Sequence, residues 1–253
     1  MELTVIGSGA AYPDRPGTAS SSYLVEHVGG RLLLDMGQGA FAGLAGRIEP
    51  AALLAAWISH LHPDHFVDLV ALRHYLRYEL DPPGRVRVLA PAGLAERLDG
   101  LLGQPGFAAE SLDVEAYREG VLAIGPFTLE IRRVTHTAAS YAVRVSLSSE
   151  PGALGLVYSG DCGRADDLAP LVRPGDDLLV EVSFGAGPPP VEGLHLDGSA
   201  VGRLAAATRA GRVLLTHLQM RRDPAAALAA VRDTYAGPVE LVRDGDRFTI
   251  AGA

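Results

Sequence analysis

The sequence predicts an α/β fold in which two mixed β-sheets pack as a layered sandwich flanked by helices. In the first half of the chain, apolar runs that alternate or meander as strands do are separated by amphipathic helical stretches. In the last third, helix and strand patterns follow each other almost continuously, an order typical of α/β architecture. With 253 residues, 48% of them hydrophobic, the chain provides for one large core. We therefore expect a single domain over residues 1–253.

The predicted strands are short apolar or alternating runs that end in turn residues. Residues 3–9 form the first, and residues 21–37 form a hairpin that turns at Val28-Gly29-Gly30. Residues 52–60 pass from a helical stretch into a strand. Further strands are expected at residues 86–91, 127–136, 140–147, 153–161, 176–184 and 212–218, with two short ones around Asp244-Gly245-Asp246.

The predicted helices have apolar residues at helical spacing. The first covers residues 65–80 and stops before Asp81-Pro82-Pro83-Gly84, because proline and glycine end helices. The others cover residues 92–103, 165–172, 197–210 and 223–235.

Composition excludes several kinds of enzyme and partner. All 22 basic residues are arginine, which excludes mechanisms that need a Schiff-base or phosphate-binding lysine. The net charge of −8 is spread along the chain, so an anionic substrate must be neutralised locally. The single cysteine, Cys162, cannot form an internal disulfide, and no stretch has the apolar length of a membrane span. The N-terminal residues predict a strand instead of a secretory signal, so we expect a cytoplasmic protein with no membrane partner.

Three histidines and an aspartate crowd into six positions in the stretch HLHPDH, from His60 to His65. If the backbone stays extended after the preceding strand, His60 and His62 project to the same side. Pro63 stiffens the bend, and His65 opens the following helix. Imidazole and carboxylate are ligands that zinc and similar ions take. The alternatives are solvated loop histidines, or a single structural metal, although structural zinc sites are usually rich in cysteine.

Three more donors stand at the ends of predicted strands: His136, Asp161 and His217. A rigid sheet presents reactive side chains in this way, from loops at its edge. A lone strand-end histidine is more often a hydrogen-bonded structural residue. Together with HLHPDH, however, these positions use five of the eight histidines, and the set predicts a metal centre.

HLHPDH, His136, the SGD that contains Asp161 and the THL that contains His217 resemble the signature motifs of the metallo-β-lactamase fold, in the same order and over essentially the whole chain. The resemblance is nearer to the ribonuclease Z-like hydrolases than to the true β-lactamases. It implies a four-layer αββα sandwich and two divalent metal ions, with zinc as the first expectation and manganese or iron as alternatives. The ligands that it implies are His60, His62 and His136 for one ion and Asp64, His65 and His217 for the other, with Asp161 bridging both.

His195 lies ahead of the predicted helix that leads to the strand ending at His217. In the ribonuclease Z-like phosphodiesterases a histidine in a similar position donates a proton, so the resemblance implies that His195 is a catalytic acid. The alternative is a loop histidine that packs near the helix start. His27, at a hairpin turn, and His74, on the polar side of a helix, have no such context.

Two such ions lower the pKa of a water molecule and so supply a metal-bound hydroxide at neutral pH. Asp64 is expected to orient this nucleophile while it binds a metal. A protonated His195 helps most where an alkoxide departs, as in a phosphodiester, and less in lactones or thioesters. We therefore predict a binuclear phosphodiesterase, with a lactonase or thioester hydrolase on the same metals as an alternative.

The transfer-RNA 3′-end endonucleases that this sequence resembles carry a long basic arm between the third metal histidine and the bridging aspartate. Here His136 and Asp161 are separated by only enough residues for two strands and a turn. A long nucleic acid is therefore disfavoured, although transfer-RNA processing stays an alternative. Arg221 and Arg222 are candidates to meet a phosphate. We expect a small phosphodiester such as a cyclic nucleotide, as for the compact cyclic-nucleotide phosphodiesterases of this fold, and a homodimer as in many relatives.

Two further features are expected to be structural. The run VIGSGAAYP lacks the third glycine of a dinucleotide fingerprint, and Pro13 and Pro16 block the helix that would follow it. We expect it to be a turn that lines the active cleft. Cys162, beside Asp161, is expected to be a buried structural thiol and not a nucleophile.

Overall fold

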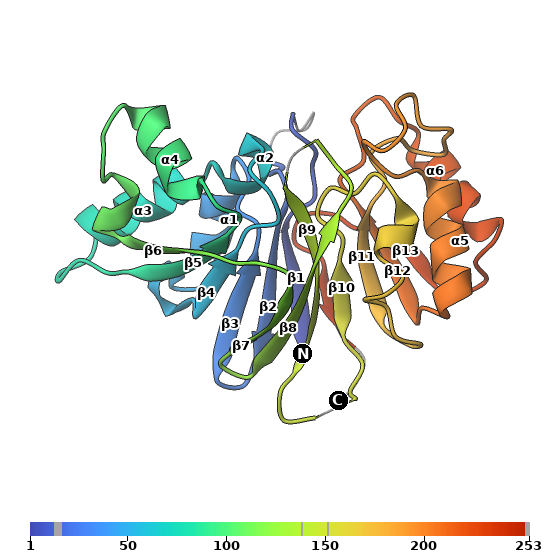
Figure 1. The fold of residues 1–253 in the computed structure, drawn as a ribbon, viewed down its shortest axis with the longest axis horizontal. Coiled ribbons are helices and arrows are strands. Elements are labelled where there is room, and N and C mark those ends of the chain that lie inside the picture. Colours follow the sequence, from blue (N-terminus) through green and yellow to red (C-terminus); the bar gives the residue numbers. More distant parts are fainter. Residues whose placement is uncertain (13–16, 138, 151, 251–253) are drawn as a thin grey trace.

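The computed structural model describes residues 1–12, 17–137, 139–150 and 152–250, which form two seven-stranded β-sheets with helices outside them (Figure 1). The sheets face each other in the middle of the molecule, so the predicted layered α/β sandwich is confirmed. One core cluster of buried side chains, which includes Trp57 and Tyr158, draws on both sheets. That the whole chain is one domain stays a prediction.

The first sheet comes mainly from the N-terminal half of the chain. In spatial order its strands are β14 (Arg247–Thr249), β1 (Glu2–Gly7), β2 (Ser22–His27), β3 (Gly30–Leu34), β4 (Ala55–Trp57), β5 (Val86–Ala90) and β6 (Leu112–Ala116). Pairing is antiparallel from β14 to β3 and parallel from β3 to β6. The antiparallel pair β2 and β3 confirms the predicted hairpin, whose turn contains Gly29 at φ +86°. Glycine adopts this conformation without steric cost.

The second sheet comes from the C-terminal half. In spatial order its strands are β13 (Val239–Leu241), β12 (Arg212–Thr216), β11 (Asp177–Glu181), β10 (Leu156–Tyr158), β9 (Ser140–Leu147), β8 (Phe127–Val134) and β7 (Gly120–Ile124). Pairing is antiparallel from β7 to β10 and parallel from β10 to β13. Consequently β8, β10, β11 and β12 all run in the same direction, and the loops after them open at one edge of the sheet.

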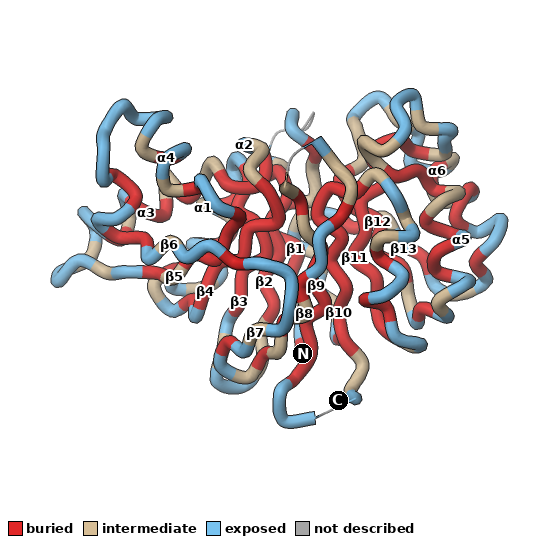
Figure 2. Tube along the Cα trace, in the orientation of Figure 1, coloured by how far each residue is buried: buried red, intermediate tan, exposed pale blue. Residues whose placement is uncertain are grey.

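Helices cover the outer face of each sheet (Figure 1). Those on the side of the first sheet are α1 (Ala40–Ala45), α2 (Pro63–Phe66), α3 (Leu69–Tyr78) and α4 (Leu94–Leu102), and those on the side of the second are α5 (Gly198–Thr208) and α6 (Pro224–Arg232). Short 3₁₀ turns cover Pro50–Ala52, Ala108–Glu110 and Ala165–Asp167. Buried residues follow the strands and the inner faces of the helices (Figure 2), so three apolar layers alternate with the secondary structure.

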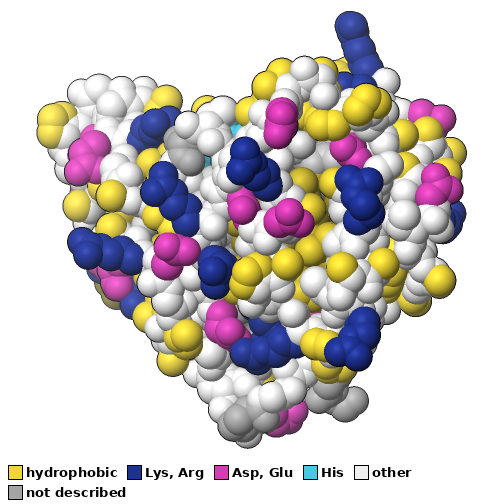
Figure 3. Space-filling view, turned by 45° about the vertical axis from the view of Figure 1, so that its right-hand side comes forward, with side chains coloured by type: hydrophobic (Ala, Val, Ile, Leu, Met, Phe, Trp, Pro, Cys, Tyr) yellow, Lys and Arg dark blue, Asp and Glu magenta, His cyan; other side chains and the backbone are white. Residues whose placement is uncertain are grey.

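The outer surface mixes charges of both signs. On the face shown in Figure 3, arginine and acidic side chains are interspersed over the strands and loops. In the part of the chain that the structure describes, no helix has the length and apolar character needed to cross a membrane.

One helix prediction was wrong. In residues 165–172 only the 3₁₀ turn Ala165–Asp167 forms, and the following residues continue as turns. Pro170 explains this, because proline has no N–H and its ring clashes with the carbonyl four residues earlier in a helix. The Asp167 side chain instead accepts a hydrogen bond from the backbone N–H of Thr135 at 2.7 Å.

The sequence analysis also missed α1 and the two edge strands β6 and β7. Both strands are short and largely exposed. β7 (GVLAI) shows no alternation of apolar and polar residues, and β6 (LDVEA) alternates over only five residues, so the pattern of a half-buried strand is absent in one and brief in the other. On β6, charged side chains pair with arginines of the neighbouring strand, as Glu115 does with Arg87 at 2.8 Å. Charged side chains on edge strands are common in natural sheets because they discourage pairing with other chains.

A buried ion pair on β9 gives a test of stability. The fully buried Arg144 donates two hydrogen bonds to Asp176, at 2.7 and 2.9 Å. Arg144→Ala leaves that carboxylate buried without its cation, so we expect the free energy of unfolding to fall by about 3–5 kcal/mol in urea denaturation. Arg173→Ala is the control. Arg144 and Arg173 both form an ion pair with Glu130, but the Arg173 side chain is 46% exposed, so we expect its loss to cost less than about 1 kcal/mol. Equal losses in the two variants would contradict this account.

Candidate metal centre

The predicted metal-binding residues lie where the carboxyl ends of strands from both sheets meet. The loop after β4 carries HLHPDH, and the loops after β8, β10 and β12 carry His136, Asp161 and His217. Parallel strands bring their carboxyl ends to one edge, where loops can present side chains from a rigid frame. Residues 60 and 217 therefore come together although most of the chain separates them.

The HLHPDH loop is held by the loop that follows β3. Met36 donates its backbone N–H to the His65 carbonyl at 2.7 Å, and the backbone N–H of Asp68 donates to the Met36 carbonyl at 3.1 Å. A Cβ on Gly37 would lie 1.9 Å from the backbone oxygen of Asp64, so this approach requires glycine. The predicted first helix is divided here into α2 and α3, because these backbone groups bond to the neighbouring loop.

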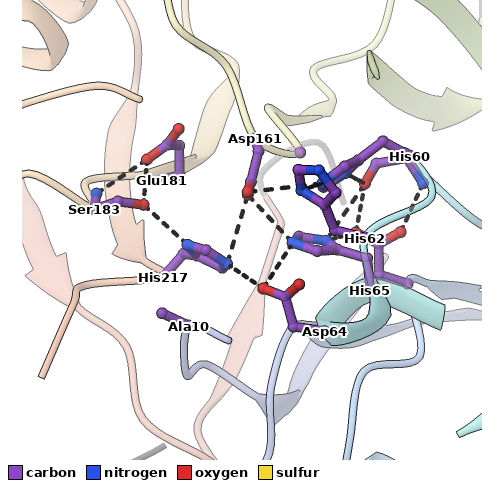
Figure 4. A network of polar contacts seen from close by, with 12 residues as sticks. Ala10, His60, His62, Asp64, His65, Asp161, Glu181, Ser183 and His217 are labelled. Carbon is purple, nitrogen blue, oxygen red and sulfur yellow. Dashed lines mark hydrogen bonds and ion pairs between the residues drawn. The ribbon is translucent and has the colours of Figure 1, made fainter. Parts of the chain in front are cut away.

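The seven predicted ligands converge in groups whose potential ligand atoms lie within 4.8 Å of one another, compact enough to hold a metal ion. Figure 4 labels all of them except His136. In the first group, His62 Nδ1 lies 3.0 Å from His60 Nε2 and 3.4 Å from His136 Nε2. The first group is His60, His62, His136 and Asp161, and the second is Asp64, His65 and His217.

Asp161 lies between the two groups with one carboxylate oxygen toward each. Its Oδ2 is 3.7 Å from His60 Nε2 and 3.8 Å from His136 Nε2. Its Oδ1 is 3.3 Å from His65 Nε2 and 3.6 Å from His217 Nε2. This is the position that a carboxylate bridging two ions requires.

Each of the five imidazoles is anchored through the ring nitrogen that faces away from the centre. His62 is held at Nε2, which lies 3.0 Å from Thr137 Oγ1, and so presents Nδ1. The other four are held at Nδ1 and present Nε2: His60 by Ser59 Oγ at 3.0 Å, His65 by Asp35 at 2.7 Å, His136 by the Leu194 carbonyl at 2.7 Å and His217 by Ser183 Oγ at 2.9 Å. Such outer contacts fix the orientation of ligand rings in metal sites.

Asp35, which the sequence analysis missed, is the most heavily used of these anchors. It is fully buried just after β3, and its Oδ2 accepts hydrogen bonds from His65 at 2.7 Å and from the Tyr158 hydroxyl at 2.6 Å. The Ser59 hydroxyl and backbone N–H donate to the same carboxylate at 2.7 and 2.6 Å. Its φ of +57° is uncommon for a residue with a side chain. An acidic residue directly after the apolar run RLLL, inside the predicted hairpin, was the signal that could have identified it.

The balance of charge tests whether these residues fit divalent cations. Asp35, Asp64, Asp161 and Glu181 are all buried here, and among the described residues no arginine pairs with any of them. Imidazoles are their only partners of opposite charge, and buried charges need compensation. Asp161 Oδ1 and His65 Nε2 are also buried without a hydrogen bond to a described residue. The donor set therefore fits divalent metal ions.

Burial sets the protonation of the first group. It lowers the pKa of His60, His62 and His136, so these rings are neutral at pH 7. Neutral imidazole is the form that binds a metal. In the second group, burial also lowers the pKa of His65 and His217, but Asp161 and other carboxylates outweigh it and raise the pKa of both rings. A cation bound there would have to displace a proton, which couples binding to pH.

Comparison with known proteins identifies the family. A family model described as "Beta-lactamase superfamily domain" matches residues 31–218.

The chain belongs to the β-lactamase superfamily.

Individual proteins of similar sequence or structure extend this result over the whole chain. An uncharacterized protein of Mycobacterium leprae is 31% identical, over 99% of this chain and 89% of its own length. The crystal structure of the metallo-β-lactamase fold protein YhfI from Bacillus subtilis superimposes with a TM-score of 0.85 at 24% identity, covering 98% of both chains. The short form of human tRNase Z gives a TM-score of 0.76 at 21% identity, covering 99% of both chains. At these identities the two structures establish the metallo-β-lactamase fold alone.

Within this superfamily fold, His195 lies beside the candidate metal groups. A ring nitrogen of His195 lies within 4.8 Å of ligand atoms of Asp161 and His217. His195 Nδ1 is 2.9 Å from Oε1 of Glu181, a buried residue at the end of β11. Burial by itself would lower the pKa of His195, but the Glu181 carboxylate outweighs it and raises the pKa to about 9. The ring is therefore protonated at pH 7.

Glu181 is the second residue that the sequence analysis missed. Its two oxygens accept hydrogen bonds from the backbone N–H groups of Cys162 and Ser183, each at 3.0 Å, and from the Ser183 hydroxyl at 2.6 Å. It therefore fixes His195 and, through Ser183, also His217. An acidic residue inside the apolar run DLLVEVSF was the available signal.

Cys162, which the sequence analysis expected to be structural, is buried, with its Sγ 3.1 Å from the Arg164 carbonyl. Burial raises the pKa of its thiol, which suits a structural role. His74 bonds to the Val70 carbonyl of its own helix. Neither His74 nor His27 belongs to a candidate metal group among the described residues.

The two arginines that follow His217 differ in position. Arg222 lines a cavity near the centre, as does Ser8 of the VIGSGAAYP run, whereas Arg221 is exposed outside this cavity. Pro13 and Pro16 lie outside the described residues.

The anchor under His65 can be tested by removing its charge. Asp35→Asn keeps the shape of the side chain but cannot accept hydrogen bonds from all its donors, so His65 loses its fixed orientation. We expect zinc affinity to fall by about 10- to 100-fold, measured by competition with a chromophoric chelator. His74→Ala is the control and should bind zinc as the wild type does. An Asp35→Asn protein with unchanged zinc affinity would show that the carboxylate has no role in the centre.

Proposed function

We propose that this chain is a binuclear metal-dependent phosphodiesterase that acts on small phosphodiesters such as cyclic nucleotides. The observation that carries the proposal is the pair formed by His195 and Glu181 beside the candidate metal groups. A protonated imidazole next to a site for divalent cations suits reactions in which an alkoxide must leave. Superfamily membership and the metal-dependent hydrolase name of YhfI support hydrolysis in general terms.

The proposed ligands are those that the sequence predicted. His60, His62 and His136 would hold one ion, Asp64, His65 and His217 the other, and Asp161 both. When bound, two divalent cations lower the pKa of a water molecule and stabilise negative charge on phosphate oxygens. Zinc suits a site of imidazoles and carboxylates, and manganese or iron would also be accepted.

The chain's own residues supply the proton transfers. Burial would raise the pKa of Asp64, but the hydrogen bond from His217 and the nearby His65 lower it, so Asp64 is an ionised carboxylate that can orient the attacking water. His195 donates through Nδ1 to Glu181, which leaves Nε2 to give its proton to the departing oxygen. The hydrogen bond to Glu181 holds the His195 ring in the same orientation before and after it gives up this proton.

Two features favour a small substrate over transfer RNA. Transfer RNA is considered because the human structural neighbour is named a tRNase. Between His136 and Asp161 the described residues form β9 and β10 as an antiparallel pair with a turn, as predicted, and this leaves no room for a long arm. Acidic and basic side chains are interspersed on the face in Figure 3, whereas nucleic acids bind to basic surfaces. A cytoplasmic location and a homodimer remain predictions.

Two bound ions should be countable. We expect wild-type protein dialysed against zinc or manganese to retain two equivalents of metal per chain, measured by inductively coupled plasma mass spectrometry. His217→Ala removes a ligand of the second group and should retain about one equivalent, because the first group keeps all its own. Wild-type protein that retains no metal would end the proposal.

The acid can be tested by changing the leaving group. Cyclic AMP releases an alkoxide that needs a proton, whereas bis(p-nitrophenyl) phosphate releases a phenolate that leaves without one. We expect His195→Ala to lower kcat for cyclic AMP by about 10²- to 10⁴-fold and for the phenyl ester much less, with metal content unchanged. Glu181→Gln should show the same pattern more weakly. His74→Ala is the control, and a lactone and a transfer-RNA precursor complete the substrate panel.

The pH dependence of kcat tests which protonation state of His195 is active. Since the protonated form is active, kcat for cyclic AMP should fall as the pH rises through the pKa of His195, which is about 9 beside Glu181 and lower once cations are bound. This alkaline limb should be absent in His195→Ala. Equal loss of both phosphodiesters in His195→Ala would refute the acid role, and faster turnover of the lactone or the transfer-RNA precursor by the wild type would favour those alternatives.

A further inference from the structure

A cavity of about 410 Å³ lies beside the candidate metal centre. This volume falls within the range of roughly 300–1,000 Å³ that is usual for small-ligand sites. Its walls include the loop after β1, from Ser8 to Ala10, the loop after His217 and the loop after β13. We call this cavity the arginine pocket, because Arg222 and Arg243 both line it.

The pocket adjoins the centre through direct contacts. The backbone N–H of His217 donates to the Ser8 carbonyl at 3.0 Å. In the view of Figure 4, Ala10, a residue of this wall, is drawn below His217 and to the left of Asp64. Asp244 fixes this wall, since its carboxylate accepts hydrogen bonds from the backbone N–H and the hydroxyl of Ser8 at 2.9 and 2.7 Å. The Ser8 wall of the pocket and the loop that carries His217 are therefore neighbours.

The arginine pocket offers positive charge that the protein itself does not use. Among the described residues, neither Arg222 nor Arg243 forms an ion pair with a carboxylate. The Arg222 guanidinium lies 5.8 Å from the centre of the Phe184 ring, and that ring packs edge-on against His195 at 5.2 Å. Among the described lining residues the one acidic side chain is Asp244, whose carboxylate accepts hydrogen bonds from Ser8. Two guanidinium groups against one carboxylate leave the pocket positive, which points to an anionic ligand.

The rim adds exposed apolar surface. Tyr12 and Met220, two of the large hydrophobic residues left exposed, both line the pocket, at 58% and 46% exposure. Leu218 and Leu241 extend this apolar surface inward. An exposed tyrosine ring near guanidinium groups suits a planar base attached to a phosphate, because rings stack and arginines bind phosphate oxygens.

We propose that the arginine pocket binds the nucleoside part of a nucleotide substrate, with Arg222 contacting the phosphate end and Tyr12 stacking on the base. This inference rests on the proposed function, whose metal centre would hold the scissile phosphate. It assigns Arg222 and Tyr12 as the residues that recognise the nucleotide.

Direct binding tests the pocket without requiring turnover. Metal-loaded protein is titrated calorimetrically with adenosine 5′-monophosphate and with inorganic phosphate. Wild type should bind the nucleotide at least about tenfold more tightly than phosphate, because the pocket adds contacts beyond the metals. Arg222→Gln should weaken nucleotide binding by about tenfold or more, the loss typical of a charge-assisted hydrogen bond. Tyr12→Ala should weaken nucleotide binding several-fold and leave phosphate binding unchanged.

Arg221→Gln is the matched control, because Arg221 is the exposed neighbour that does not line the pocket. It should bind both ligands as the wild type does. For cyclic AMP, Arg222→Gln should raise KM, whereas Arg221→Gln should leave it unchanged. Melting temperature and metal content show that each variant is folded and loaded.

The outcomes separate this inference from the proposed function. Equal nucleotide affinity in Arg222→Gln and Arg221→Gln, or a wild type that binds the nucleotide no more tightly than phosphate, would overturn the pocket assignment even if phosphodiesters are hydrolysed. Nucleotide binding that depends on Arg222, in a protein that hydrolyses no phosphodiester, would support the pocket and refute the phosphodiesterase.

Discussion

The structure depends on one electrostatic constraint, which is that several carboxylates are buried at the meeting edge of two sheets with only imidazoles as counter-charges. A buried carboxylate without compensation costs several kcal/mol. Asp161 shows the consequence most clearly, because each of its oxygens faces a different group of rings and one has no hydrogen bond among the described residues. The site is built for cations that the chain itself does not supply.

The two sheets make such a site possible because they hold it from both sides. Asp35 and Glu181 stand at corresponding places, each at the end of a strand in a different sheet, and each orients a histidine by a short hydrogen bond. Asp35 and His217 both adopt positive φ, near +57° and +56°. Backbone strain of this kind persists where the surrounding structure fixes it, and it gathers at functional sites.

The proposed chemistry and the proposed binding surface meet at the same ring. Phe184 packs edge-on against His195, and its ring centre lies 5.8 Å from the Arg222 guanidinium. The acid that would protonate a leaving group therefore borders the pocket that would hold a nucleoside. The loop after β11, which carries Phe184 and His195, and the loop after β12, which carries Arg222, therefore connect the proposed reaction site to the proposed nucleoside pocket.

The sequence by itself determined the layered fold, most of the strands and the side chains that gather at the centre. It did so because apolar periodicity is a local property, and because HLHPDH and the strand-end donors are unusual residues at recognisable places. Only the tertiary structure revealed Asp35 and Glu181 as anchors, since their importance lies in the histidines that they contact, 30 and 14 positions away in the chain. Only the tertiary structure also distinguished Arg222 from Arg221. Two adjacent arginines look alike in the sequence, and the conformation of the loop decides which of them lines the pocket.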